Sequence, residues 1–521
     1  MGLLTAIADY YRLARAGATM ARHDVVMPAD IKARLPWPGK VAGAILRALP
    51  GASRKGRPGE RFARALEKMG PAYIKLGQFL STRPDLIGFD AASDLGRLKD
   101  ALPPFSQKRA EALLVSEFGD DAKTLFPKLP TPIAAASIAQ VHKIETPKGF
   151  KAVKLLRPGV EKKIALELRA MARGARVVEK SSAEGRRLRA VEFVKTLHQS
   201  MTRELDFRFE AGAASEFADI VKADGFYSAP EVDWDRTSLR VLTTSWVDGV
   251  PMTQPGALEG VDRVELANKV TRGFLATALD HGFFHADVHE GNMILTAPAR
   301  EGELHGLAMI DFGIMGRIGP RERLFLAEIM NGFITRNYSR IAKVHFAAGY
   351  VPPEHKVEDF AQALRSVGEP IFGKTAESVS MGRLLMQLFD ITHQFGMKMR
   401  PELVMLQKTM VQVEGVARTI DPHHDIWNAA RPVVERWVAR EFGPQGAIST
   451  AGTLITETTD RLKRLPEVMD RFEAALVQME APPPEPRKSS GHLWFLAFLS
   501  LLICVTLISL AGIGLEYVRP S

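Results

Sequence analysis

The sequence predicts an α+β protein with two lobes, a helical extension before the first lobe and an apolar helix close to the C-terminus. Three observations carry this prediction. A strand pattern surrounds Lys154 in the first lobe, and polar blocks occupy residues 285–292 and 311–313 in the second. An uncharged segment of 23 residues, 493–515, follows near the end of the chain.

The two polar blocks have the form of metal-dependent phosphoryl-transfer motifs. The first reads H-x-D-x-x-x-x-N and contains Asp287 and Asn292, and the second is D-F-G, whose Asp311 follows Asp287 by 24 residues. In this chemistry the first Asp orients or deprotonates the attacking hydroxyl, and the Asn and the D-F-G Asp bind Mg²⁺. Asp287 is therefore the candidate catalytic residue, and Asn292 and Asp311 are candidate metal ligands. A hairpin of residues 293–295 and 307–310 is expected between the blocks.

The same region allows a zinc site as an alternative. His281, His285 and His289 are four residues apart, so on one helix they would share a face. Gly282 and Gly291 favour a loop instead, and a zinc site leaves the D-F-G block without a role.

The strand that carries Lys154 is expected at residues 150–156, where Arg157-Pro158-Gly159 ends it. Ala152 and Lys154 share a face of this strand because side chains alternate. In a kinase such a lysine reaches the α- and β-phosphates while the small alanine lies against adenine. Residues 137–145 and a turn at 147–149 complete a hairpin.

Alanine replaces glycine in the segment before this hairpin. It reads Ala134-Ala135-Ala136-Ser137, where a protein kinase has G-x-G-x-x-G. Because alanine avoids positive φ, this loop is expected to be stiffer than a glycine loop and to approach phosphate less closely. The four residues are candidates for nucleotide binding.

A carboxylate partner for Lys154 is expected in a helix that starts near Val191 and continues through residue 210. Glu204 and Glu210 are six residues apart, so on that helix they point in different directions and only one of them pairs with Lys154. The sequence leaves open which one does, and a solvated charged helix face is the alternative.

The segment Lys75-Leu76-Gly77-Gln78 adds a motif that protein kinases lack. Together with the alanine-rich loop, the E-x-D of Glu204 and Asp206 and the two polar blocks, it closely resembles the UbiB family of atypical kinases, which supports ubiquinone (coenzyme Q) biosynthesis. The resemblance extends over about residues 60–316.

This resemblance implies a protein-kinase-like two-lobed fold that binds ATP or ADP with Mg²⁺. The K-x-G-Q helix would lie over the place where a protein substrate binds, which assigns Lys75 and Gln78 to the working site. Lys154 takes the role of the nucleotide lysine. The acidic contacts fall on three carboxylates: Glu204, Asp206 and Glu210.

Some positions depart from the family pattern. Ser245 stands in the hinge where the family has Glu or a similar residue, and Val288 and Glu290 replace two prolines of the catalytic block. Adenine is held mostly by backbone groups at a hinge, so Ser245 is expected to leave nucleotide binding in place. Val288 and Glu290 occupy spacer positions between the ligands, so no loss of function is expected from them. No A-P-E motif follows Gly316, and a long helix is expected from Arg321 to Ile334.

The chain divides into six expected regions. In order they are an N-terminal helical segment, a helical extension with the K-x-G-Q motif, a first kinase-like lobe, a second and mainly helical lobe, a helical tail with a Pro-rich linker, and a transmembrane helix: 1–50, 51–128, 129–255, 256–440, 441–491 and 493–515.

Residues 493–515 are predicted to span a membrane because about 20 apolar residues cross a bilayer core. Trp494 and Tyr517 lie at its ends, and Arg487 and Lys488 precede it, which favours a single-pass bacterial inner-membrane protein with its catalytic part in the cytoplasm. A mitochondrial inner membrane is the less favoured location.

The N-terminal segment has helical spacing of apolar residues and is expected to pack on the kinase body, with a position on a membrane surface as the alternative. The spaced positions are Leu4, Ile7, Tyr11 and Ala14. The formal charge of +9 fits a membrane surface or plain solubility, since the basic residues are scattered, no nucleic-acid motif is present and no nucleic-acid partner is expected. The single cysteine, Cys504, fits a reducing compartment.

The expected partners are a membrane lipid or quinone precursor and quinone biosynthesis proteins. Three alternatives for function are a small-molecule kinase of the aminoglycoside or choline type, a non-catalytic nucleotide-binding scaffold, and a hydroxylase acting on the quinone ring. The alanine-rich loop and Lys75-x-Gly-Gln78 weigh against the first, and no flavin, haem or iron signature supports the last. The sequence leaves the phosphoryl acceptor and the oligomeric state undetermined.

Overall fold

The fold is known from a computed structural model. It describes residues 3–23, 25, 56–81, 87, 89–96, 98, 102–181, 186, 189–298, 305–369, 387, 391, 394–397 and 401–442.

The first lobe is built on an antiparallel sheet with the strand order β1-β2-β3-β4. The strands are β1 (Ala134–Ala135), β2 (Ala139–Thr146), β3 (Gly149–Leu156) and β4 (Val241–Ser245). The predicted hairpin is confirmed, since β2 and β3 pair along their whole length and Val141 lies opposite Lys154. Gly149 closes the turn with a φ of 95°, a conformation that glycine adopts without strain.

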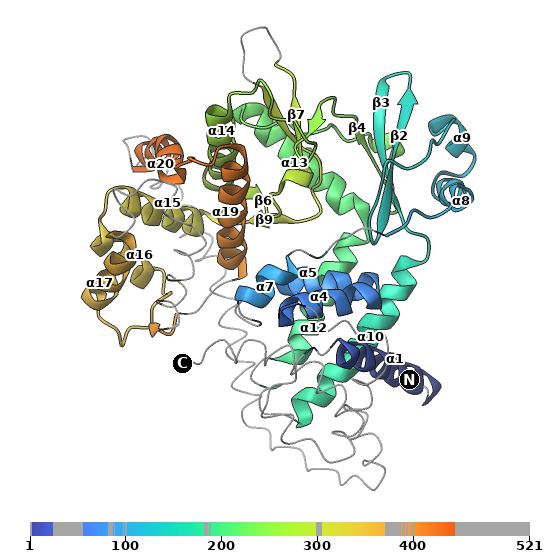
Figure 1. Cartoon of the computed structure of the whole chain (residues 1–521), viewed down its shortest axis with the longest axis horizontal. Helices are drawn as coiled ribbons and strands as arrows, with labels where there is room; N and C mark the ends of the chain where they lie inside the picture. The colour runs from blue at the N-terminus through green and yellow to red at the C-terminus, as the bar shows by residue number, and fades with distance from the viewer. Residues whose placement is uncertain are drawn as a thin grey trace, which may run out of the picture.

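Short helices cover one face of this sheet. They are α8 (Gln107–Phe118), η1 (Gly119–Asp121) and α9 (Ala122–Leu125), and they lie outside β2 and β3 in Figure 1. Leu113, Leu114 and Phe126 pack there against Ile144 and Val153 of the sheet. Burial of these apolar side chains fixes the sheet against the helices.

A second core joins the N-terminal extension to the long helices of the first lobe. The extension contributes α4 (Pro58–Met69), α5 (Pro71–Ser81) and α7 (Phe89–Leu95), and the lobe contributes α10 (Val160–Ser181), α12 (Ala190–Glu204) and α13 (Phe207–Asp224). Phe62 and Leu66 of the extension pack in one cluster with Leu156, Ile164 and Phe207. The extension is therefore part of the body of the protein.

The first helix, α1 (Leu3–Arg22), packs on α10 as expected, but it does so through another face than the sequence indicated. Asp9 is fully buried and accepts hydrogen bonds from Arg169 at 2.9 Å and Arg173 at 3.1 Å. The apolar positions Leu4 and Ile7 are 83% and 56% exposed. A buried carboxylate with two guanidinium partners thus holds this helix in place.

The single helix predicted from Val191 through residue 210 is wrong. Helix α12 ends at Glu204, and Asp206 has an extended backbone and begins α13 as its N-cap. The Asp206 carboxylate accepts the Arg208 amide at 3.1 Å and the Arg208 guanidinium at 2.9 Å. At the start of a helix the first amides have no carbonyl partner within the helix, and the Asp206 side chain accepts one of them. In a continuous helix these amides would already be bonded.

The second lobe begins with two small antiparallel sheets. Strands β5 (Val250–Pro251), β7 (Met293–Thr296) and β8 (Gly306–Met309) form one, and β6 (Phe283–His285) and β9 (Met315–Arg317) form the other. The hairpin predicted between the two polar blocks is confirmed by the β7–β8 pairing, in which Met293 lies opposite Met309. It brings Asn292 and Asp311, which flank it, to the same end.

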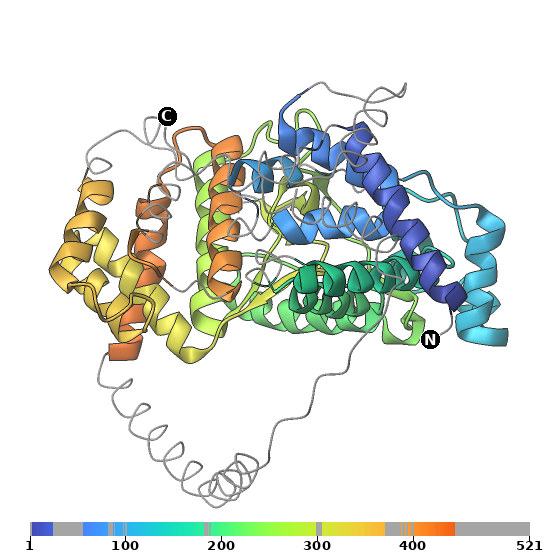
Figure 2. The ribbon, with the colours of Figure 1, turned by 90° about the horizontal axis from the view of Figure 1, so that it is seen from below.

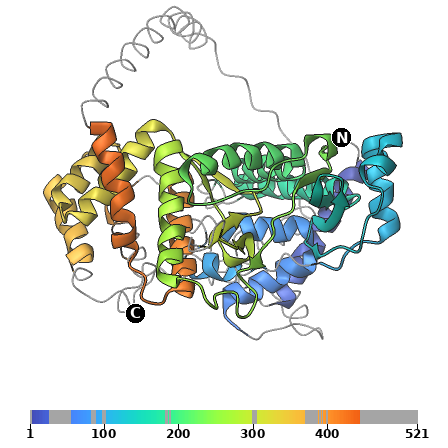
Figure 3. The same ribbon diagram turned by 90° about the horizontal axis from the view of Figure 1, so that it is seen from above.

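Helices make up the rest of the second lobe. They are α14 (Arg263–Ala276), α15 (Pro320–Ile334), α16 (Tyr338–Ala347), α17 (Val357–Gly368), α19 (Pro401–Ile420) and α20 (Ile426–Phe442). The helix predicted from Arg321 to Ile334 is confirmed as α15. Figures 1, 2 and 3 place α16 and α17 at one end of the molecule and α8 and α9 at the other.

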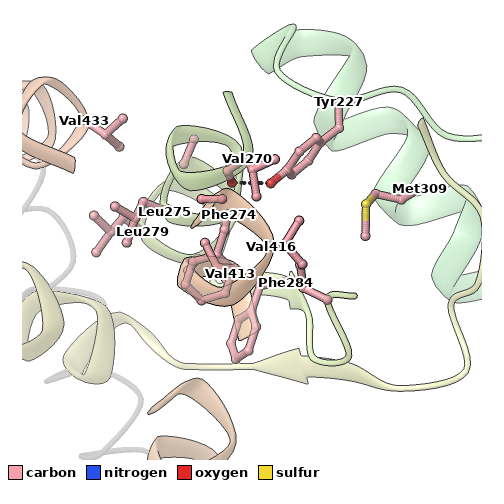
Figure 4. Packing of buried hydrophobic residues seen from close by; sticks show 14 of the residues in the cluster. Tyr227, Val270, Phe274, Leu275, Leu279, Phe284, Met309, Val413, Val416 and Val433 are labelled. Carbon is pink, nitrogen blue, oxygen red and sulfur yellow. Dashed lines mark hydrogen bonds between the residues drawn. The ribbon is translucent and has the colours of Figure 1, made fainter. Parts of the chain in front are cut away.

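The core of the second lobe surrounds α14. Figure 4 shows Phe274, Leu275 and Leu279 among Val413 and Val416 of α19, with Phe284 of β6 beside them. The hydroxyl of Tyr227 donates to the Val270 carbonyl in this otherwise apolar region. Because α19 is part of this core, apolar packing fixes its position relative to β6, the strand that leads into the first polar block.

The predicted membrane span, 493–515, lies outside the described residues, as do Cys504 and the Pro-rich linker. Among the helices that the structure does describe, none combines the length and the apolar character needed to cross a membrane.

Candidate active site

Lys154 brings two carboxylates together from different parts of the chain. Its ammonium nitrogen lies 2.7 Å from Glu210 Oε1, in the first turn of α13, and 3.3 Å from Asp311 Oδ2, which follows β8. Burial opposes the charge on this side chain, but the two carboxylates outweigh it and hold the pKa of Lys154 above its ordinary value. Glu210, and not Glu204, is thus the partner that the sequence left open.

Asp311 is held in an ionised form. Its Oδ1 accepts the Gly313 amide at 3.0 Å while Oδ2 faces Lys154. Burial by itself would raise the pKa of Asp311, but the charge of Lys154 and the Gly313 hydrogen bond lower it to about 2. A half-buried carboxylate of this kind is a suitable ligand for a hard cation.

Glu204 pairs with Lys75 of the extension. The Lys75 ammonium on α5 forms an ion pair with the Glu204 carboxylate at the end of α12, and both side chains are mostly buried. Gln78 lies one turn further along α5 and is half-buried. Asp206 contacts Arg208 and caps α13, so of the three carboxylates only Glu210 contacts Lys154.

Gly77 explains why the K-x-G-Q motif contains a glycine. A Cβ atom at this position would come within 2.3 Å of Leu98 Cδ1 and 2.7 Å of Leu66 Cδ1. Both leucines are buried, so an added side chain would force the packing around α5 to shift. The missing side chain lets α5 approach its neighbours closely and brings Lys75 to the first lobe.

His285 connects the two polar blocks. Its ring is buried, Nδ1 accepts the Asp287 amide at 3.1 Å, and Nε2 donates to the Asp311 carbonyl. These two bonds require a neutral ring, and burial lowers the pKa of His285 in agreement. The first residue of H-x-D therefore acts as a positioning residue for both aspartates, a role that the sequence did not reveal.

Asp287 is surrounded by donors. His289 Nε2 lies 3.6 Å from its Oδ2, and two side chains of α19 approach Oδ1, Gln412 at 3.2 Å and Lys408 at 3.7 Å. Burial by itself would raise the pKa of Asp287, but the His289 hydrogen bond and the charge of Lys408 hold it well below its ordinary value. In turn, the Asp287 carboxylate raises the pKa of His289.

Lys408 and Gln412 were missed by the sequence reasoning. No local motif marks them, and Gln412 is 125 residues from Asp287 in the chain. The only signal available was their spacing of four on a helix, which brings two polar side chains onto one face.

Asn292 offers its oxygen to a cation. The side-chain nitrogen donates to the Asp287 carbonyl at 3.1 Å, which orients the amide so that its oxygen could bind a cation. Together with the Asp311 carboxylate it makes an all-oxygen donor set, which fits Mg²⁺ better than a softer metal.

The remaining candidates lie around β3. Ala152 is on this strand opposite Lys143 of β2 and Thr244 of β4. Ala134 and Ala135 form β1, and the Ala136 amide donates to the Ala139 carbonyl at 2.7 Å.

The segment after β1 is held on a second side as well, because the Arg157 guanidinium donates to the Ala136 carbonyl at 3.0 Å. Ser137 is fully buried. The alanine-rich segment is thus partly strand and fixed by backbone bonds.

The histidines of the zinc alternative have separate partners. His281 contacts Asp224, His285 contacts backbone groups, and His289 contacts Asp287. Within the described residues, no three His, Cys, Asp or Glu side chains are grouped so that they could hold a metal ion.

The fold and the paired motifs define a kinase-like protein, and comparison with known proteins agrees. Residues 97–345 match the ABC1 atypical kinase-like domain, and residues 364–425 match the UbiB helical domain. A solved structure of Rv3197 from Mycobacterium tuberculosis, a complex with erythromycin, is 23% identical and has a TM-score of 0.50 over 71% of this chain and 93% of that chain. It supports the fold.

Two relatives are described as probable protein kinase UbiB. The one from Marinobacter nauticus is 37% identical over 84% of this chain and 79% of its own length. The one from Azotobacter vinelandii is 33% identical over 88% and 85%. The chain therefore belongs to the UbiB family of atypical kinases.

Proposed function

We propose that the protein binds Mg²⁺-ATP or Mg²⁺-ADP between its lobes and acts on the terminal phosphoryl group. The contact of Lys154 with both Glu210 and Asp311 is the observation that carries this proposal. The Lys154–Glu210 pair corresponds to the lysine–glutamate pair that kinases need for phosphoryl transfer, and the second contact brings the D-F-G aspartate of the second lobe to the same lysine.

Each polar residue then has a defined role. Lys154 binds the α- and β-phosphates, with Glu210 orienting it, and Ala134–Ser137 and Ala152 line the nucleotide. Asn292 and Asp311 would hold Mg²⁺, which neutralises phosphate charge when bound. Asp287 orients the O–H group that attacks. His285 holds Asp287 and Asp311 in fixed relative positions through its hydrogen bonds to their backbone groups.

The acceptor is proposed to be water or a small or lipid molecule. The family resemblance implies that helix α5, whose Lys75 pairs with Glu204, lies on the side of the nucleotide site where a protein segment would have to enter. Lys75 and Gln78 are therefore assigned to the working site, where they limit access by protein substrates.

In the cell, the protein is proposed to support ubiquinone biosynthesis at a membrane. The resemblance to the UbiB family supports this role, with a quinone precursor, a membrane lipid or quinone biosynthesis proteins as partners. Residues 493–515 would anchor the chain in the bacterial inner membrane, with the catalytic part in the cytoplasm.

Asp311→Asn tests the proposal. Nucleotide affinity should depend on Mg²⁺ in the wild type, and the variant should lose that dependence while it remains folded. Equal affinity with and without Mg²⁺ in the wild type contradicts the assignment. In a deletion strain, the wild-type gene should restore quinone content and Asp311→Asn should not, whereas full rescue by the variant contradicts a role for the nucleotide.

A further inference from the structure

Helix α19 supplies two polar side chains to the catalytic aspartate. Lys408 and Gln412 are four residues apart and share a face of the helix, and both approach Asp287 Oδ1, at 3.7 Å and 3.2 Å. They lie in the region that matches the UbiB helical domain, whereas Asp287 lies in the kinase-like domain. The two domains therefore meet at the carboxylate that orients the acceptor.

Stability of the fold does not account for Gln412. Its Nε2 donates to Asp287, but its Oε1 is buried and has no hydrogen-bond partner among the described residues. A buried carbonyl oxygen without a donor destabilises a protein, and an apolar side chain of the same size would avoid that cost. The hydrogen bond that the Gln412 amide does make goes to Asp287.

The charges around Asp287 indicate that Lys408, like Gln412, acts on this carboxylate. The catalytic block, residues 285–292, contains no Lys or Arg, so its own sequence brings no permanent positive charge to Asp287. Lys408 brings that charge from α19, whose place is fixed because Val413 and Val416 pack in the core around α14. A rigid helix thus presents a cation and an amide to one carboxylate.

We propose that Lys408 and Gln412 are positioning residues of Asp287, and that the helical domain forms one wall of the active site. They hold the carboxylate in the orientation that receives the acceptor O–H, be it water or an alcohol. The inference rests on the proposed function for the role of Asp287.

Kinetics of four variants of the full chain test the idea. Lys408→Met and Gln412→Met should lower kcat for ATP turnover about tenfold, with the KM for ATP changed less than about twofold. Lys408→Arg should recover part of the loss because it restores the charge. Lys343→Met, on the exposed surface of α16, is the matched control and should keep wild-type kinetics. Unchanged kcat in Lys408→Met and Gln412→Met overturns the proposal.

Thermal unfolding separates positioning from a merely structural role. Gln412→Met should unfold at the wild-type temperature or above it, because it removes an unpaired buried oxygen. A lower unfolding temperature together with a matching loss of activity would mean that Gln412 only stabilises the fold, which overturns the proposal for that residue.

A second unfolding experiment is independent of turnover. Lys408→Met should lower the unfolding temperature in the wild-type background and lower it less in Asp287→Asn, where no carboxylate remains to be compensated. Equal shifts in both backgrounds overturn this inference. A wild-type chain that neither binds nor hydrolyses ATP overturns the proposed function instead, and the unfolding comparison still decides whether Lys408 acts on Asp287.

Discussion

Lys75 of the extension and Glu204 at the end of α12 form an ion pair between mostly buried side chains. Six residues later in the chain, Glu210 pairs with Lys154. The break between α12 and α13 separates the two carboxylates, so that one faces the extension and the other the nucleotide lysine. One short stretch of chain thus connects the extension to the Lys154 cluster.

Lys75→Ala should loosen the contact between the extension and the first lobe. Glu204 loses its cation, so nucleotide handling should change, self-phosphorylation should appear or increase, and rescue of quinone synthesis should fall. ATP turnover, phosphate incorporation and quinone content measure the three effects. Lys68→Ala, an exposed change on the neighbouring helix α4, is the control. A normally folded Lys75→Ala protein that is unchanged in all three assays would falsify the assignment.

Glu210→Gln should weaken both stability and nucleotide binding. The change removes the nearest carboxylate of a Lys154 that is only 21% exposed, which leaves Asp311 as its partner. The free energy of unfolding should fall by about 1–3 kcal/mol, measured by urea denaturation. Affinity for Mg²⁺-ADP should fall about tenfold, because the lysine is no longer oriented.

The control for this change lies on the same helix. Glu216 pairs with Arg317 at the surface and is 44% exposed, so Glu216→Gln should alter stability by less than about 0.5 kcal/mol. An equal loss of unfolding free energy in Glu210→Gln and Glu216→Gln would show that the Lys154–Glu210 contact stabilises the protein no more than a surface ion pair does.

Stability should fall as the pH drops below about 6.5, the ordinary pKa of histidine. His142 is fully buried, its Nδ1 donates to the Pro130 carbonyl at 2.7 Å, and its Nε2 accepts from Gln140 at 2.9 Å. The Gln140 amide is oriented by the Phe105 amide, which donates to its oxygen at 2.9 Å. A second proton on the His142 ring would sit on Nε2 and face the Gln140 N–H group, which is a donor and cannot accept it.

The sign follows from burial, which lowers the pKa of His142 in the folded chain. Below pH 6.5 the unfolded chain takes up a proton that the folded chain does not, so this contribution is complete above that pH and is lost as the pH falls. Unfolding temperatures between pH 7.5 and 5.5 should show the decline, and His142→Gln should flatten part of it. An equal slope in His142→Gln and wild type argues against this origin, and exposed His198→Gln is the control.

Removal of residues 493–521 should release the protein from membranes or leave it weakly bound. The deleted part contains the uncharged segment, and the rest of the chain is expected to provide at most peripheral attachment. Fractionation and carbonate extraction of the full and shortened chains measure the difference. A shortened chain that still resists carbonate would mean that another segment inserts.

The sequence predicts local elements of this protein well. Residues 150–156 and the pair of strands around Gly306 have β-forming residues and glycine turns, and both hairpins form. Signals of this kind lie within a few residues of one another, so they can be read without the fold. The motif residues Lys154 and Asp311, which the sequence assigns to one site, lie 3.3 Å apart in the structure.

Contacts between residues far apart in the chain could not be predicted from the sequence. The choice between Glu204 and Glu210 depended on a helix break at Asp206, whose side chain competes for a backbone amide. The contact between α19 and Asp287 depends on how the helices of the second lobe pack around α14, which no local pattern specifies.

Gly77 of the K-x-G-Q motif determines how closely helix α5 packs against its neighbours in the extension. One added methyl group at Gly77 would meet Leu66 and Leu98 and lift α5, and the two charged partners beyond it would part without any change of charge. On the proposed function, in which the extension covers the nucleotide site, the apolar contacts of Gly77 with Leu66 and Leu98 would set how firmly that cover closes.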